Sequence, residues 1–178
     1  SVTATYSRTA GETVADSPYT TSATLSPAEV LDNYAITYNT AVFTINAKPV
    51  TVTADAKTKV YGDPDPALTY QITSGSLVTG DSFSGGLTHD AGENVGAYNI
   101  NQGSLTLNSN YVLTYVGGKL TIKDRPITVT ADSQSKVYGD ADPALTYKIT
   151  SGSLAFSDVF TGDLTRDTGN NVGAYNIN

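Results

Sequence analysis

The chain has 178 residues, 39% hydrophobic and 15% charged, which is enough for one to three small folded domains. Its formal net charge of -7 argues against nucleic-acid binding, and no basic or long apolar run suggests binding to a membrane or insertion into one. With no cysteine and one histidine, the chain has almost no material for disulfides, zinc sites or nucleophilic triads.

The dominant feature of the sequence is an internal repeat of 77 residues. Residues 49–101 and 126–178 align without a gap at this offset, and 38 of the 53 aligned positions are identical. Residues 1–48 match the second half of the same unit. We therefore divide the chain into a first repeat (1–48, the C-terminal half of a divergent unit), a second repeat (49–125, a complete unit) and a third repeat (126–178, an incomplete unit). Because the chain lacks Met, we expect it to be an internal piece of a longer polypeptide.

Alternation of apolar and polar residues predicts β-strands along the second repeat. Val50, Val52 and Ala54 alternate with polar residues, which is the period of a strand with one buried face. The pattern recurs between turn sequences rich in Gly, Asn, Asp and Pro. The further apolar positions are Leu68, Tyr70, Ile72, Tyr98, Ile100, Leu105, Leu107, Tyr111, Leu113, Tyr115, Leu120 and Ile122. We expect the tyrosines among them to lie in the core.

About six short strands in each repeat predict an all-β chain of tandem small β-sandwich (Ig-like) modules arranged as a rod. The alternative is a β-grasp-like sheet with one short helical turn per module, for which residues 77–83 are the candidate. The linkers, residues 45–50 and 122–127, are short and each contains a proline that restricts the backbone. We therefore expect stiff connections between the repeats.

Pairs of carboxylates in turns are the best candidates for a metal site. The second and third repeats both carry two aspartates, two residues apart, directly after a Tyr-Gly pair. Calcium takes several oxygen ligands, whereas the alternative interpretation is that these aspartates cap turns through the backbone. The spacing does not match an EF-hand loop, and no other cofactor is expected. The weak calcium candidates are Asp63, Asp65, Asp81, Asp140, Asp142 and Asp158.

Two tyrosines and the single histidine are further candidates for function. Tyr61 and Tyr138 lie in predicted turns rather than on strands, so they are the interface candidates among the tyrosines. His89 could serve as a base or a metal ligand, but Arg8 and Arg166 occupy the equivalent positions of the other repeats. This substitution by arginine favours a position that accepts a solvated cation over a catalytic one.

Four motifs of the second repeat resemble the MBG repeat of the YGX type. They are Lys59-Val60-Tyr61-Gly62-Asp63, Leu68-Thr69-Tyr70, Gly75-Ser76-Leu77 and Asn94-Val95-Gly96-Ala97-Tyr98. The resemblance covers the chain from Pro49 onward, twice. The departures are modest: Val78-Thr79-Gly80 becomes Ala155-Phe156-Ser157, and Glu93 becomes Asn170. It implies a tandem array in a large bacterial secreted or surface protein, often adhesin-like, and it transfers no catalytic or ligand residue to this chain.

The sequence therefore predicts a structural spacer or stalk repeat of an extracellular or cell-surface adhesin-like protein, and not an enzyme. One alternative is a filament built head to tail, in which residues 25–48 of one copy complete the third repeat of another by strand addition. The other is weak binding of a surface glycan or a host protein, strengthened by avidity. The expected partners are thus neighbouring repeats, identical chains, or such a ligand.

Overall fold

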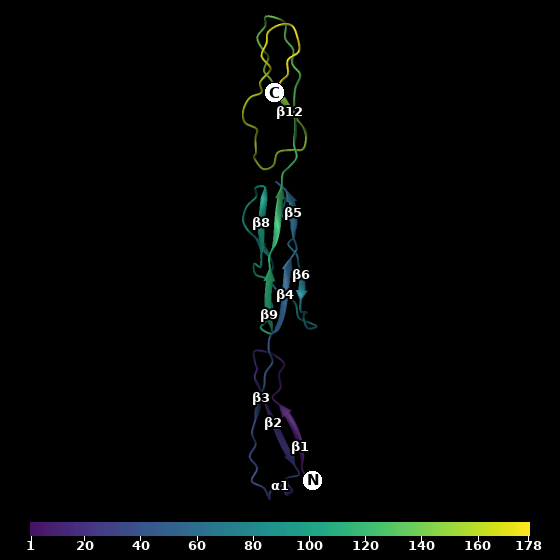
Figure 1. The fold of residues 1–178 in the computed structure, drawn as a ribbon, viewed down its shortest axis with the longest axis vertical. Coiled ribbons are helices and arrows are strands. Elements are labelled where there is room, and N and C mark those ends of the chain that lie inside the picture. The colour runs from purple at the N-terminus through teal and green to yellow at the C-terminus, as the bar shows by residue number, and fades with distance from the viewer. The chain divides into compact units, whose positions relative to one another are not determined.

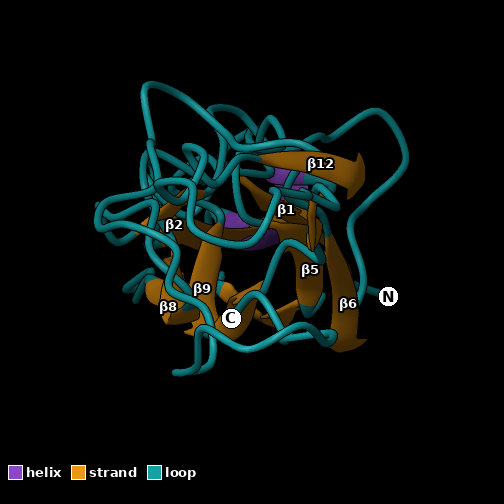
Figure 2. Cartoon of the chain, turned by 90° about the horizontal axis from the view of Figure 1, so that it is seen from above, coloured by secondary structure: helices purple, strands orange, loops and turns teal.

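The computed structural model describes all of residues 1–178 and confirms the all-β class (Figure 1). Figure 2 shows strands and loops almost throughout, with little helix. The elements are β1 (Thr3–Arg8), β2 (Tyr19–Ser26), α1 (Ala28–Leu31), β3 (Ala41–Phe43), β4 (Lys48–Ala54), β5 (Lys57–Val60), β6 (Tyr70–Ser74), β7 (Thr88–His89), β8 (Gly96–Asn101), β9 (Tyr111–Val116), β10 (Gly118–Lys123), β11 (Thr128–Ala131) and β12 (Tyr147–Ser151).

The strands form four small sheets, with orders β1-β2-β3, β6-β4-β9, β5-β10-β8-β7 and β11-β12. The chain divides into two compact units, and both draw on the second repeat. The first unit consists of residues 1–56, 68–90 and 99–119, and the second consists of residues 57–67, 91–98 and 120–178. The Ig-like arrangement within each module and the predicted repeat boundaries stay predictions.

The core of the first unit is built around β4. This strand pairs with β9 in parallel and with β6 antiparallel, so both of its edges are covered. Its alternating residues Val50, Val52 and Ala54 are buried, as the period-2 pattern predicts. Leu105 and the Tyr111 ring complete the buried cluster. Fully burying a Val or Leu side chain stabilises a fold by roughly 1.5–3 kcal/mol, so this cluster stabilises the unit.

The second unit contains the parallel pair β5–β10, in which Leu120 lies opposite Lys57 and Ile122 opposite Lys59. Leu120 and Ile122 are almost completely buried. Lys59 is also buried, and its ammonium contacts Asp65 at 2.7 Å and Glu93 at 2.6 Å. Hydrogen bonds from Lys59 to these two carboxylates raise its pKa. The two ion pairs therefore compensate the cost of removing the ammonium from water.

Counterpart residues of the repeats differ in burial. Tyr111 of β9 is 8% exposed, but its counterpart Tyr34 in the first repeat is 66% exposed and lies outside any strand. β9 depends on β4 for its only strand pairing, and no such strand lies beside residues 34–39. Likewise Val129 of β11 is 43% exposed, because β11 pairs only with β12, whereas its counterpart Val52 is fully buried.

The helical turn of the β-grasp-like alternative, for which residues 77–83 are the candidate, is absent. That segment contains a tight turn closed by the Asp81 amide donating to the Val78 carbonyl at 3.0 Å. Gly75 and Gly80 have φ values of +77° and +95°, which a right-handed helix cannot contain. The one helix is instead α1 in the first repeat, where a proline precedes a short run of good helix formers.

The alternation pattern also fails at two places in the second repeat. Ile72 falls on the predicted apolar face but is 42% exposed, because β6 is an edge strand. Leu105 is buried as predicted but does not lie in a strand, and only an isolated bridge joins neighbouring Thr106 to Ser84. The pattern thus identified Leu105 as a core residue without identifying the local backbone conformation.

Candidate functional site

The contact between the second and third repeats is built on a turn that follows β5, which we call the Tyr61 tip (Tyr61, Gly62 and Asp63). The Asp63 amide donates to the Val60 carbonyl at 3.0 Å, and the Tyr61 amide donates to the Lys123 carbonyl of β10 at 2.9 Å. Gly62 has a φ of +84°, a conformation that favours glycine. The tip is therefore anchored to the end of the β5–β10 pair.

A second turn, residues 155–158, contacts this tip from the third repeat, and we call it the docking loop. The Tyr61 hydroxyl donates to Asp158 Oδ2 at 2.9 Å, and this hydrogen bond raises the pKa of Tyr61. The rings of Tyr61 and Phe156 meet edge to face, 5.4 Å between centroids. Ala155 is 7% exposed and packs against Gly62 so closely that a Cβ on Gly62 would overlap the Ala155 Cβ.

The linker between the two repeats is held at the same place. Arg125 Nε donates to the Tyr61 carbonyl at 2.9 Å, and Arg125 Nη2 contacts Asp63 Oδ1 at 3.1 Å. A planar guanidinium with several donors is suited to fixing two acceptors at once. The tip, the linker and the docking loop therefore form one connected interface between neighbouring repeats.

Of the two predicted interface tyrosines, only Tyr61 lies in this contact. Tyr138 occupies the equivalent tip of the third repeat and is 69% exposed. A Cβ added to Gly139 beside it would meet nothing within 4 Å, in contrast to one added to Gly62.

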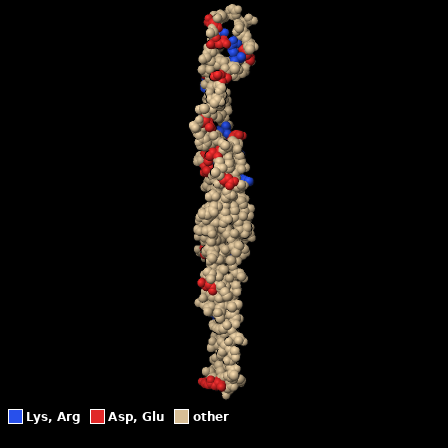
Figure 3. All heavy atoms as spheres, turned by 90° about the vertical axis from the view of Figure 1, so that its left-hand side faces the viewer, with Lys and Arg blue, Asp and Glu red and all other residues tan.

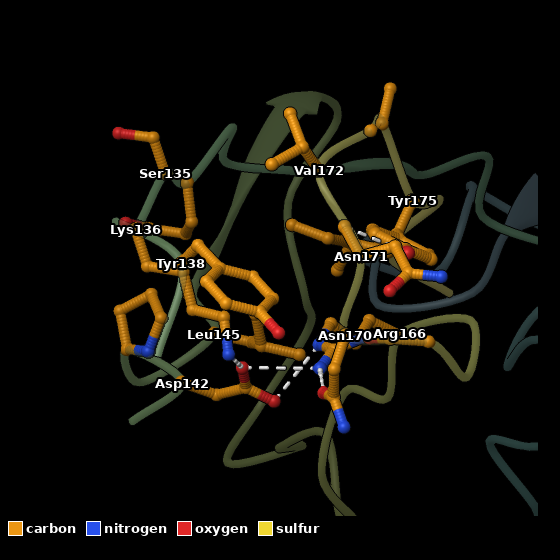
Figure 4. A pocket seen from close by; sticks show the side chains of 16 residues that line it. Ser135, Lys136, Tyr138, Asp142, Leu145, Arg166, Asn170, Asn171, Val172 and Tyr175 are labelled. Carbon is orange, nitrogen blue, oxygen red and sulfur yellow. Dashed lines mark hydrogen bonds and ion pairs between the residues drawn. The ribbon is translucent and has the colours of Figure 1, made fainter. Parts of the chain in front are cut away.

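The third repeat also contains an open groove of about 500 Å³ (Figure 4). Residues 134–136 line one part of it and residues 173–175 another. Their counterparts in the second repeat belong to β5 and β8, which are separated by β10 in the order of that sheet. We call this hollow the strand groove, because it corresponds to the position that β10 fills in the second repeat.

A charged cluster lies in the strand groove (Figure 4). The Arg166 guanidinium holds both oxygens of Asp142, at 2.9 and 3.1 Å, and Lys136 contacts the same carboxylate at 2.6 Å. Arg166 and Lys136 together lower the pKa of Asp142 to about 2. Arg166 also donates to the Gly169 carbonyl at 2.8 Å and lies over the Tyr175 ring. Its counterpart Arg8 in the first repeat is placed in the same way against Gly11 and Tyr19.

His89 holds the equivalent position in the second repeat, at the end of β7. Its Nδ1 lies 2.7 Å from the Asp90 carbonyl oxygen, and the ring is partly buried. Asp90 in turn accepts hydrogen bonds from the side chains of Asn101 and Asn99, each at 2.7 Å, which lower its pKa. These bonds tie the β7–β8 connection together, so the structure gives this region a role in shaping a turn.

The six candidate calcium ligands each contact other protein groups. Three of them form ion pairs: Asp63 with Arg125, Asp65 with Lys59, and Asp142 with Lys136 and Arg166. Two accept hydrogen bonds from tyrosine hydroxyls, Asp81 from Tyr111 and Asp158 from Tyr61, and Asp81 also accepts one from Asn108. The main-chain carbonyl of Asp140 accepts a hydrogen bond from Lys136. No group of three or more His, Cys, Asp or Glu side chains is placed to hold a metal ion. On the face seen in Figure 3, most charged side chains lie in the upper part of the view, and a wide area below them is almost uncharged.

The sequence analysis did not identify Arg125, Ala155 and Phe156 as interface residues, nor Lys59 as a buried ion-pair residue. A signal was available for two of them, because the docking loop is one of two places where the second and third repeats differ at three consecutive residues; the other is residues 56–58. Nothing in the alternation pattern marks Lys59, since its burial arises from carboxylates 6 and 34 residues away along the chain.

Together these features define an all-β chain of tandem repeats, with specific contacts between the second repeat and the third. A family model for the MBG domain (YGX type) matches residues 50–121 and 127–178, and the chain belongs to that family. It is a family of structural-type repeats, typical of extracellular proteins, and not an enzyme family. No curated protein and no solved structure matches the chain. None of its helices has the length and apolar character needed to span a membrane.

Proposed function

We propose that the chain is a spacer, or stalk, segment of a large bacterial extracellular or cell-surface adhesin-like protein. The observation that carries this proposal is the interface of the Tyr61 tip, Arg125 and the docking loop. A flexible tether needs no contacts between its modules, whereas a spacer that holds a distal region at a set distance does. Membership of the MBG family supports the extracellular setting.

A surface-display experiment tests the spacer function. One, two or three copies of the full chain are placed between a cell-wall anchor and an epitope tag, and the height of the tag above the surface is measured by super-resolution microscopy. We expect the height to grow in equal steps with copy number. A chain with Tyr61→Ala and Phe156→Ala should give smaller, more variable steps, because the docked interface is lost. Height independent of copy number would refute the proposal.

A second candidate function is assembly into a filament, in which an apolar strand of one copy adds to a sheet of another. Phe43 of β3 and Ile45 just after it are the counterparts of Leu120 and Ile122, the buried residues of β10. Phe43 is 47% exposed and lies on β3, an edge strand that pairs only with β2, so the second edge of β3 is open to strand addition. Polymers that grow with concentration and disappear when residues 25–48 are deleted would support this candidate. Monomers at every concentration would reject it.

The remaining candidate function, weak binding of a glycan or host protein, is tested with single and tandem copies of the full chain. The chain is applied to a glycan array and to host-cell surfaces as single and tandem copies. Binding that rises steeply with copy number would favour an avidity role. Equal, background-level signal for single and tandem copies would leave the spacer as the function of the array.

A further inference from the structure

We propose that the Tyr61 tip is a selective docking site that accepts a following repeat only when its loop carries a small residue, then an aromatic residue, and an aspartate two residues later. This inference rests on the proposed spacer function. It adds that the loop sequence of a repeat determines whether that repeat docks on the one before it. The second and third repeats are 38 of 53 identical, yet three consecutive differences fall on residues 155–157 of the docking loop. Two of those residues, Ala155 and Phe156, contact the tip directly.

The first selective contact is steric. Gly62 and Ala155 are so close that a single added Cβ on the glycine would overlap the alanine. The equivalent of Ala155 in the second repeat is Val78, which carries two more methyl groups. A loop of the second-repeat type would therefore collide with Gly62 or move away from the tip. The space beside Gly62 accepts alanine but not valine.

The second selective contact depends on the backbone of the docking loop. In the turn of the second repeat, Gly80 has a positive φ of +95°, and the φ of the preceding Thr79 is negative. In the third repeat Ser157 replaces this glycine, and the positive φ of 50° moves to Phe156. A non-glycine residue in that conformation is strained. The strained residue is the one whose ring meets Tyr61, so the contact with the tip holds the turn in this form.

The aspartate of the loop does not discriminate between repeats, since both loops have one. Asp158 accepts the Tyr61 hydroxyl at 2.9 Å, while its counterpart Asp81 accepts the Tyr111 hydroxyl at 2.5 Å inside its own repeat. The hydrogen bond with Tyr61 therefore adds to the contact but does not distinguish one loop from the other. Selectivity resides in Ala155 and Phe156.

Distance measurements between spin labels test this selectivity in the full chain. The protein has no cysteine, so the substitutions Ala91→Cys and Thr161→Cys place one label in the second repeat and one in the third. Both sites are exposed. Double electron–electron resonance then reports the distribution of distances between the repeats. We expect a single narrow distribution for the otherwise unchanged chain.

The decisive variant carries A155V, F156T and S157G, which gives the third repeat the loop of the second. We expect the narrow distance to be lost. The matched control is the reciprocal exchange V78A, T79F and G80S, which leaves the Tyr61 tip and its docking loop untouched and should retain the narrow distance. A155V alone, compared with F156T alone, separates the steric contribution from the ring contact. Circular dichroism confirms that each variant keeps its β content.

The outcomes separate this inference from the spacer proposal. A narrow distance in both the unchanged chain and the A155V, F156T, S157G variant would overturn the selectivity but leave a fixed spacer in place. A broad distance in the unchanged chain would mean that the tip and the loop do not stay docked, which overturns the selectivity directly. The display-height experiment then decides the spacer function independently.

Discussion

The closest contact of the inter-repeat interface can be tested by adding one methyl group. Gly62→Ala introduces a Cβ that overlaps Ala155, while Gly139→Ala makes the same change at the equivalent turn, where nothing lies within 4 Å. Both glycines have positive φ values, +84° and +95°. Comparing the two variants therefore separates the loss of stability caused by the positive φ from the loss caused by the contact with Ala155.

The expected magnitudes follow from these two contributions. An alanine at positive φ costs about 1–2 kcal/mol, partly offset by about 0.4–1 kcal/mol from the less flexible unfolded chain. Gly139→Ala should therefore lower the free energy of unfolding by roughly 1 kcal/mol. Gly62→Ala should cost about 1–3 kcal/mol more, because it also opens the ring contact of Tyr61 and Phe156 and the hydrogen bond to Asp158.

Urea unfolding followed by circular dichroism measures these differences. The double variant Gly62→Ala, Ala155→Gly restores the missing space and should recover part of the loss, although it removes one buried methyl group worth about 0.8 kcal/mol. Equal losses for Gly62→Ala and Gly139→Ala, with no recovery in the double variant, would show that no close contact between Gly62 and Ala155 contributes to stability.

Three further predictions concern burial and charge. Leu120→Ala should cost about 2–5 kcal/mol in urea unfolding, because Leu120 is 0% exposed, whereas Phe43→Ala at the equivalent position, 47% exposed, should cost about 1 kcal/mol or less. Lys59→Met should cost about 1–2 kcal/mol, less than for a fully buried ion pair because its carboxylate partners are 40% and 51% exposed. Because the Lys59 pKa is raised above 10.5, its contribution is complete below that pH and should fade as the pH rises through the folded-state value. Carboxyl NMR titration should give a pKa of about 2 for Asp142, and this pKa should rise toward 3.8 in Arg166→Gln. The contribution of Asp142 to the free energy of unfolding is present above pH 3.8 and should be lost as the pH falls through about 2.

Much of the fold could be predicted from local patterns in the sequence. Val50, Val52, Leu120 and Ile122 are buried where the period of two places them. A strand presents alternate residues to opposite faces, so this property is written in the order of residues and does not depend on distant contacts. The same reasoning failed at Ile72, because an edge strand has the same alternation as a central one but less cover.

The candidate site was harder to predict because it joins residues far apart in the sequence. Tyr61 meets Asp158 at a separation of 97 residues, and Arg125 meets Tyr61 at a separation of 64. The turn sequence around Tyr61 indicated only that the side chain was free of strand packing. The partner of that side chain depends on which turn of the next repeat comes near it.

The sequence by itself determined the repeating unit, the all-β class and the alternation that places apolar side chains on one face. Tertiary structure alone decided what these residues meet: Tyr111 lies in β9 beside β4, and Tyr61 meets the docking loop of the next repeat. The physical reason is that an amino acid carries its strand preference with it, whereas burial and hydrogen bonding require a second surface. That surface comes from residues elsewhere in the chain, so a local motif does not by itself determine its environment.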